Sequence, residues 1–285
     1  MQVQWYPGHM AKAKRMLAEQ LKLIDLVIEV LDARIPRSSA NPDLNNLIGA
    51  KPRLSVLNKA DLADPKASRE WISYFANLGI KALAVNSNRR EGMADVVKAA
   101  ELLAEDKLMQ GRRKYLLKRP VRAIVVGIPN VGKSSLINGL VKKSSARTGD
   151  KPGITKGKQW IRVLTNLELL DTPGLLWPKF EEPEVGFHLA ITGAISDQVY
   201  DLVEAAVKLL AVLKREYAAA LIDRYKLTEL KEDNHKLLEE LGVRRGLLGP
   251  GGIVEVEKTA LMLLQDFRQG KLGRITLEKV SEGKN

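Results

Sequence analysis

The stretch VRAIVVGIPNVGKSSLINGLV, residues Val121 to Val141, decides the fold class of this 285-residue chain. An apolar run typical of a buried strand leads into Gly127 to Ser134, which matches the pattern GxxxxGKS, and a helix-like segment follows. Glycines let such a loop curl until its backbone N–H groups and the helix N-terminus face phosphate oxygens. Strand, loop and helix in this order predict a nucleotide-binding α/β domain.

The residue types within the loop predict separate roles. Lys133 would reach the β and γ phosphates, and Ser134 would hold Mg²⁺. The side-chain amide oxygen of Asn130 could help to hold a monovalent cation. The nucleotide-binding residues expected here are Asn130, Val131, Gly132, Lys133, Ser134 and Ser135.

A second motif, Asn58-Lys59-Ala60-Asp61, follows the apolar run Leu54 to Leu57 and predicts which base is bound. The Asp61 carboxylate accepts hydrogen bonds, so it suits the N1–H and amino donors of guanine and would stay unpaired against adenine. Asn58 can support the base through its amide, and the methylene stem of Lys59 can cover the ring. Alone, these four residues could form an ordinary turn; beside a phosphate loop they predict guanine binding.

The next apolar run along the chain, Ala82 to Val85, ends at Asn86 and Ser87. A loop that backs the base is expected at this place. The segment departs from the usual SAK pattern because it lacks Ala-Lys. We nevertheless assign Asn86 and Ser87 to the nucleotide site.

A third motif, Asp171-Thr172-Pro173-Gly174, ends the apolar run Leu167 to Leu170. It fits a segment in which Asp171 touches the Mg²⁺ shell and the N–H of Gly174 senses the γ-phosphate. Upstream, Thr155 lies in a polar loop and is the candidate second hydroxyl ligand of Mg²⁺, with an ordinary loop threonine as the alternative. The metal ligands predicted are therefore Ser134, Thr155 and Asp171.

The residues after Gly174 depart from many GTPases, which position the attacking water with a glutamine. Leu175 and Leu176 cannot orient water, so we expect slow intrinsic turnover. His9, in the segment WYPGH, could swing toward the γ-phosphate and orient or deprotonate water. A helix-capping or surface position is the alternative for His9.

The motifs occur in a rotated order. Usually the phosphate loop opens such a domain and NKxD closes it, whereas here NKAD comes first, so we predict a circularly permuted P-loop GTPase domain over residues 1–185. Its alternating apolar runs and helical stretches predict a mostly parallel sheet covered by helices. Residues 186–285 predict a small all-helical domain. Helical periodicity runs through Asp201 to Tyr217, Leu227 to Leu241 and Val256 to Phe267.

Composition favours a polyanionic partner such as nucleic acid, because 46 Lys and Arg residues face 34 Asp and Glu. A basic enzyme that works alone is an equal alternative. The candidate RNA contacts are Lys12, Lys14, Arg15, Arg244 and Arg245.

The chain has no cysteine, no signal-peptide pattern and no apolar run of the roughly 18 residues that a membrane helix needs. We expect a cytoplasmic monomer with no membrane segment.

Taken together, the motifs resemble those of the ribosome biogenesis GTPase A family, the YlqF or RbgA type of circularly permuted GTPase. The resemblance rests on NKAD, GIPNVGKSS, KPGIT and DTPG in this order, and on WYPGHMAKA, LDARIP and LLWPKFEEPEVGFHLA. It implies hydrolysis of GTP to GDP and phosphate in a late step of large (50S) ribosomal subunit assembly, on the pre-subunit and its rRNA. It also implies that the helical domain of residues 186–285 binds RNA or the ribosome. It also implies a catalytic role for His9, and K⁺ at Asn130 as a candidate second cofactor beside Mg²⁺.

Two other functional classes stay open. A GTP-binding RNA-interaction protein with little turnover agrees with Leu175, though less well with the full set of Mg²⁺ ligands. A small-molecule kinase or NTPase conflicts with guanine selection by NKAD.

Overall fold

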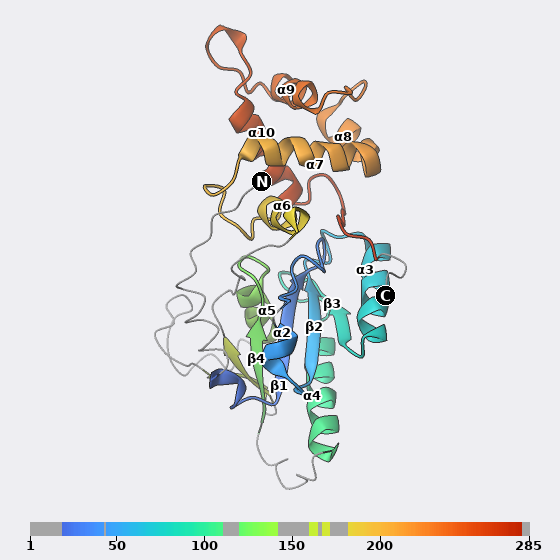
Figure 1. Ribbon diagram of the computed structural model, residues 1–285, viewed down its shortest axis with the longest axis vertical. Helices are drawn as coiled ribbons and strands as arrows, with labels where there is room; N and C mark the ends of the chain where they lie inside the picture. The colour runs from blue at the N-terminus through green and yellow to red at the C-terminus, as the bar shows by residue number, and fades with distance from the viewer. Residues whose placement is uncertain are drawn as a thin grey trace. The chain divides into compact units, whose positions relative to one another are not determined.

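The chain forms two compact units. The computed structural model describes residues 19–42, 44–110, 120–141, 160–164, 167–171 and 182–280. The first unit holds the described residues up to 171 together with 278–280, and the second holds residues 182–277. Figure 1 shows the helices and strands of both units.

The first unit is built on a sheet with the strand order β3-β2-β1-β4-β6-β5 (Figure 1). Neighbouring strands run parallel, except that β5 runs antiparallel to β6 at one edge. The central strand β1 is buried along its whole length, as expected for a parallel strand with both faces covered. The strands are β1 (Leu26–Asp32), β2 (Arg53–Asn58), β3 (Lys81–Ala84), β4 (Val121–Val126), β5 (Trp160–Leu164) and β6 (Leu167–Asp171).

Helices cover both faces of this sheet. Helices α2 and α3 lie on one face of the sheet, and α4 and α5 lie on the other (Figure 1). On the first face, Trp71 and Phe75 of α3 pack against Leu31 and Leu57. The helices are α2 (Leu44–Ile48), α3 (Pro65–Asn77), α4 (Met93–Gln110) and α5 (Lys133–Leu140).

The sheet confirms the predicted fold class. The strand before NKAD is β2, yet the strand before the phosphate loop is β4, which comes later in the chain and lies beside β1. From β1 the chain builds outward through β2 and β3, and from β4 it builds the opposite half of the sheet. The boundary between β1 and β4 is therefore a topological switch point, where ligands bind outside the carboxyl ends of the strands.

The second unit is helical and has its own core. Leucines of α7 lie at its centre and contact α8, α9 and α10. The elements are α6 (Pro183–Ile191), α7 (Leu202–Glu216), α8 (Ala218–Tyr225), α9 (Asn234–Arg244), a 3₁₀ turn (Pro250–Gly252) and α10 (Val256–Arg268). Within the described ranges, no helix combines the length and apolar character needed to cross a bilayer.

One predicted helix is wrong at its start. The apolar period predicted a helix from Leu227, but α9 begins at Asn234. The Asp233 carboxylate accepts the N–H groups of His235 and Lys236, which caps the first turn at that position. The helical period in the preceding residues therefore reflects packing of a turn against the core.

Candidate nucleotide-binding site

The predicted site lies at the carboxyl edge of the sheet, where the loops after β1, β2, β3 and β4 meet. The phosphate loop follows β4, the NKAD turn follows β2, and Asn86 and Ser87 follow β3. Hydrogen bonds between these loops join segments that are far apart in the chain.

The phosphate loop has the backbone geometry that its glycines predict. Gly132 caps the start of α5 with φ +96°, a left-handed conformation that favours glycine. A Cβ at Gly132 would lie 2.2 Å from Asn58 Nδ2, so a side chain there would displace the Asn58 amide. The Lys133 ammonium folds back and donates to the Ile128 carbonyl at 2.8 Å. Ser134 lies exposed in the first turn of α5, whose N-terminal end favours anions.

Asn58 joins three loops through its side-chain amide. Its Nδ2 donates to the Val131 carbonyl of the phosphate loop at 2.9 Å. Its Oδ1 accepts from the Ser87 hydroxyl at 2.7 Å and from the Ser87 N–H at 3.2 Å. Asn58 is buried, so this amide holds the phosphate loop and the loop after β3 at a fixed separation.

Lys59 connects the NKAD turn to two further segments. Its ammonium donates to Asp32 Oδ2 at 3.0 Å and to the Asn130 carbonyl of the phosphate loop at 2.8 Å. Lys59 and Asn130 both have positive φ, +60° and +57°, so the two turns meet in left-handed conformations. Ala60 continues the turn by donating its N–H to the Val85 carbonyl.

Asp61 and Asn86 each have side-chain polar atoms without a partner among the described residues. Within the part of the chain that the structure describes, the partly exposed Asp61 carboxylate has no hydrogen-bond or ion-pair partner. Asn86 is buried and its Oδ1 accepts the Arg89 N–H, while its Nδ2 has no partner among the described residues. A carboxylate left available at this edge is what recognition of guanine requires.

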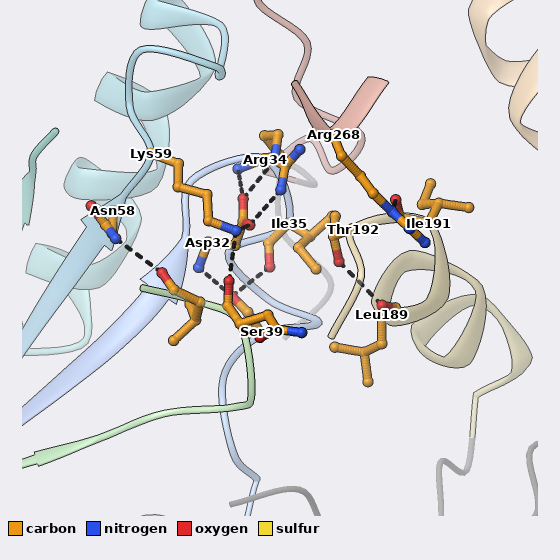
Figure 2. Close-up of polar contacts among 12 residues, drawn as sticks. Asp32, Arg34, Ile35, Ser39, Asn58, Lys59, Leu189, Ile191, Thr192 and Arg268 are labelled. Carbon is orange, nitrogen blue, oxygen red and sulfur yellow. Dashed lines mark hydrogen bonds and ion pairs between the residues drawn. The ribbon is translucent and has the colours of Figure 1, made fainter. Parts of the chain in front are cut away.

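Asp32 is a buried charged group within LDARIP, and the motifs predicted no role for it in the nucleotide site. Burial by itself raises the pKa of its carboxyl, but the charges of Arg34 and Lys59 outweigh burial and hold the pKa well below its usual range. Arg34 is also buried and contacts both carboxylate oxygens (Figure 2). Asp32 is therefore an anion at neutral pH, sharing its charge between two cations.

Several predicted residues lie outside the described residues. These are His9, Thr155, Gly174, Leu175 and Leu176, and the basic residues Lys12, Lys14 and Arg15. Asp171 ends β6 as its motif predicted, but its side chain is outside the description. Their roles remain predictions.

Sequence reasoning missed the Asp32 and Arg34 pair as part of the site. The available signal was two charged residues directly after an apolar run, at the carboxyl end of a predicted parallel strand.

Arg90 was also missed. Its guanidinium donates to the carbonyls of Gly139 and Val141 and so ties the loop after β3 to the last turn of α5.

This fold, with its phosphate loop after β4 and its NKAD turn after β2, defines a circularly permuted P-loop GTPase. A sequence model of the 50S ribosome-binding GTPase family matches residues 122–244, which include the phosphate loop and leave out NKAD, as a rotated motif order requires. The chain belongs to the ribosome biogenesis GTPase A family. The protein of that name from Bacillus cereus is 48% identical over 282 residues, which cover 99% of this chain and 95% of the relative.

A more distant relative and two solved structures are also similar to this chain. Mitochondrial ribosome-associated GTPase 1 of Bos taurus is 34% identical over 295 residues, covering 96% of this chain and 88% of its own length. GNP-bound YlqF from T. maritima superposes with a TM-score of 0.67 at 25% identity, covering 94% of this chain and 98% of that one. The GDP-bound structure of TM YlqF has the same fold, with a TM-score of 0.69 at 24% identity and coverage of 94% and 100%.

Proposed function

We propose that this chain hydrolyses GTP to GDP and phosphate when docked on the precursor of the large ribosomal subunit, in a late step of its assembly. Membership of the ribosome biogenesis GTPase A family supports the reaction and its setting. The observation that carries the proposed nucleotide site is the Asn58 amide, which joins the phosphate loop to the loop after β3. Asp61 lies in the same turn, and its carboxylate has no partner among the described residues. This arrangement supports a single site for base recognition and phosphate binding.

The donor set fits GTP and Mg²⁺. The Lys133 ammonium, now on the Ile128 carbonyl, lies within the phosphate loop and would exchange that weak acceptor for phosphate oxygens. Among the described residues no group of three or more acidic, His or Cys side chains could hold a metal by itself. Mg²⁺ is usually bound through one or two carboxylates beside waters and substrate phosphates. We assign its protein ligands to the Asp171 carboxylate and to the Ser134 and Thr155 hydroxyls.

Catalysis needs a group that orients water, since Leu175 cannot. We assign this role to His9, and we assign K⁺, as a candidate second cofactor, to the Asn130 amide. The exposed position of Asn130, at a left-handed turn of the phosphate loop, supports the second assignment.

The ribosomal partner would be bound through basic surfaces, including residues 186–285 as the RNA- or ribosome-binding domain. Arg244 and Arg245 lie exposed at the end of α9. The Arg245 guanidinium lies 5.1 Å from the centre of the buried Tyr225 ring, and this contact helps to fix the exposed arginine in place. Exposed arginines suit an RNA ligand, because RNA offers phosphates. A cytoplasmic monomer fits this role.

Base selection is tested with Asp61→Asn. The amide replaces one acceptor oxygen with a donor, so affinity for GDP should fall while affinity for xanthosine diphosphate, which carries an oxygen in place of the amino group, should rise. Fluorescence titration of both nucleotides measures the exchange. Glu70→Gln, an exposed change on α3, is the control. Unchanged preference for GDP would remove Asp61 from the site.

Turnover is tested in potassium and in sodium buffer, with and without purified large subunits, for the parent chain and His9→Ala. We expect subunits to stimulate the parent, and His9→Ala to bind GTP without stimulation. Binding without turnover under every condition would favour the GTP-binding RNA-interaction protein. Binding to subunits should weaken steeply as salt rises.

A further inference from the structure

We propose that Asp32 is a positioning residue of the nucleotide site and acts on the nucleotide through Lys59. The inference deepens, and rests on, the guanine-nucleotide function proposed above. Lys59 has two acceptors that come from different parts of the chain, the Asp32 carboxylate at the end of β1 and the Asn130 carbonyl in the phosphate loop. Asp32 is thus connected to the phosphate loop by a single lysine side chain (Figure 2).

Asp32 is itself held rigidly. Arg34 Nε donates to Oδ1 at 2.9 Å and Nη2 donates to Oδ2 at 2.7 Å, and the Arg34 backbone N–H adds a third bond at 3.1 Å to Oδ1. The Asp32 N–H donates to Ser39 Oγ, and the Ser39 hydroxyl donates to the Ile35 carbonyl. A two-pronged guanidinium contact fixes the plane of the carboxylate and leaves Oδ2 directed at Lys59.

The Lys59 side chain needs such an anchor. It is partly exposed, at 22% of its full surface, and a lysine stem is flexible unless both of its ends are held. Without Asp32, the Asn130 carbonyl would be the only acceptor among the described residues to hold the ammonium. Each nucleotide that binds would then have to order the stem against the base, which weakens binding. Asp32 therefore pre-orders Lys59 before the nucleotide arrives.

A purely structural role for the pair makes a different prediction. A buried ion pair that only supports the end of β1 should change the unfolding of the chain and leave the nucleotide dissociation rate alone. Positioning through Lys59 should instead change dissociation, and to a similar extent for GDP and GTP, because both share the base that Lys59 would cover.

The test measures dissociation of fluorescently labelled GDP and GTP by stopped flow, using the full chain with Mg²⁺. Asp32→Asn keeps the shape and removes the charge, and it should speed dissociation about tenfold for both nucleotides. Lys59→Met should also speed it, and Asp32→Asn added to Lys59→Met should change the rate less than about twofold further, because the two residues act as one unit.

Two further variants separate positioning from stability. Asp32→Asn leaves buried Arg34 without its counter-charge, so the charge-balanced double variant Asp32→Asn with Arg34→Gln is measured beside it and should dissociate GDP as fast. Asp197→Asn is the matched control, since Asp197 also binds an arginine in two-pronged fashion, but within the helical unit. It should leave GDP dissociation unchanged.

The outcomes are distinguishable. Parent protein that fails to bind labelled GDP would overturn the proposed function and this inference with it. Parent protein that binds GDP with an unchanged rate in both Asp32 variants would overturn the inference alone. The inference would also be overturned if the effects of Asp32→Asn and Lys59→Met on the dissociation rate multiply in the double variant, because the two side chains would then act independently.

Discussion

The Glu278 carboxylate accepts the backbone N–H of Arg37 at 2.7 Å, although 241 residues separate them in the chain. The N–H and hydroxyl of Ser38 donate to the same carboxylate, and the Glu278 carbonyl accepts the Trp71 indole N–H at 3.0 Å. The chain thus returns from the helical unit to the sheet unit and ends its described part there. The loop that it binds is the one that carries Arg34 and Ser39, the supports of Asp32.

Replacing Glu278 with alanine should lower the free energy of unfolding by about 1–3 kcal/mol, because two backbone N–H groups lose a charged acceptor. Urea unfolding of the full chain measures this difference. Glu70→Ala, an exposed change on α3, should stay within about 0.5 kcal/mol of the parent. Equal midpoints for Glu278→Ala and the parent would show that the contact adds no stability.

Gly132→Ala should raise the Kd for GDP at least about tenfold, equivalent to about 1.4 kcal/mol. The new Cβ would collide with Asn58 Nδ2, which must then leave the Val131 carbonyl and release the phosphate loop. Fluorescence titration with labelled GDP checks the change. Gly79→Ala is the matched control, because Gly79 also has positive φ and a Cβ there would meet nothing within 4 Å.

The control should lose stability through backbone strain of roughly 1 kcal/mol while it keeps its affinity for GDP. Loss of affinity in both variants would mean that general strain, and not the contact with Asn58, weakens the site.

Much of the fold could be predicted because its signals are local. Apolar runs ending at motif residues predicted β2, β3, β4 and β6, and the motif order predicted that the sheet is permuted. The Glu278 contact could not be predicted, since spacing across 241 residues carries no periodic signal.

The residues of the candidate site also divide into those with a local sequence signal and those without one. Motif spacing placed Asn58 and Lys59 in the site, but the role of Asp32 depends on which way a strand-end side chain points and on the loop after it. Arg34 lies two residues further on and folds back onto Asp32, a contact that no residue pattern specifies. Its charge alone would have suggested a surface position.

Arg268→Lys should destabilise the helical unit by about 2–4 kcal/mol although it keeps the charge. The guanidinium binds both oxygens of Asp197 and also donates to the carbonyls of Ala190 and Ile191 at the end of α6. Lysine cannot serve these acceptors together. Unfolding followed by circular dichroism measures the loss.

Arg215→Lys is the control, because its pair with Glu216 is exposed and should be worth less than about 1 kcal/mol. Equal losses in the two variants would show that the geometry around Arg268 adds nothing beyond its charge.

The buried Glu29 should make stability depend on pH. Burial raises the pKa of its carboxyl above the ordinary value of 4.5, against the opposing effects of Arg53 and of hydrogen bonds from Asn41 and Ser55. A carboxyl whose pKa is raised by folding binds its proton more tightly in the folded state. The stability it contributes is complete below the unfolded pKa and is lost as pH rises through the folded pKa.

The parent should therefore lose stability relative to Glu29→Gln as pH rises from about 4.5 toward 7, because glutamine keeps the shape and cannot ionise. Urea unfolding of both proteins across this range gives the difference directly, since groups common to both cancel. A difference that stays flat, or that grows in favour of the parent with rising pH, would mean that Arg53 compensates fully for burial and that Glu29 is charged at no cost.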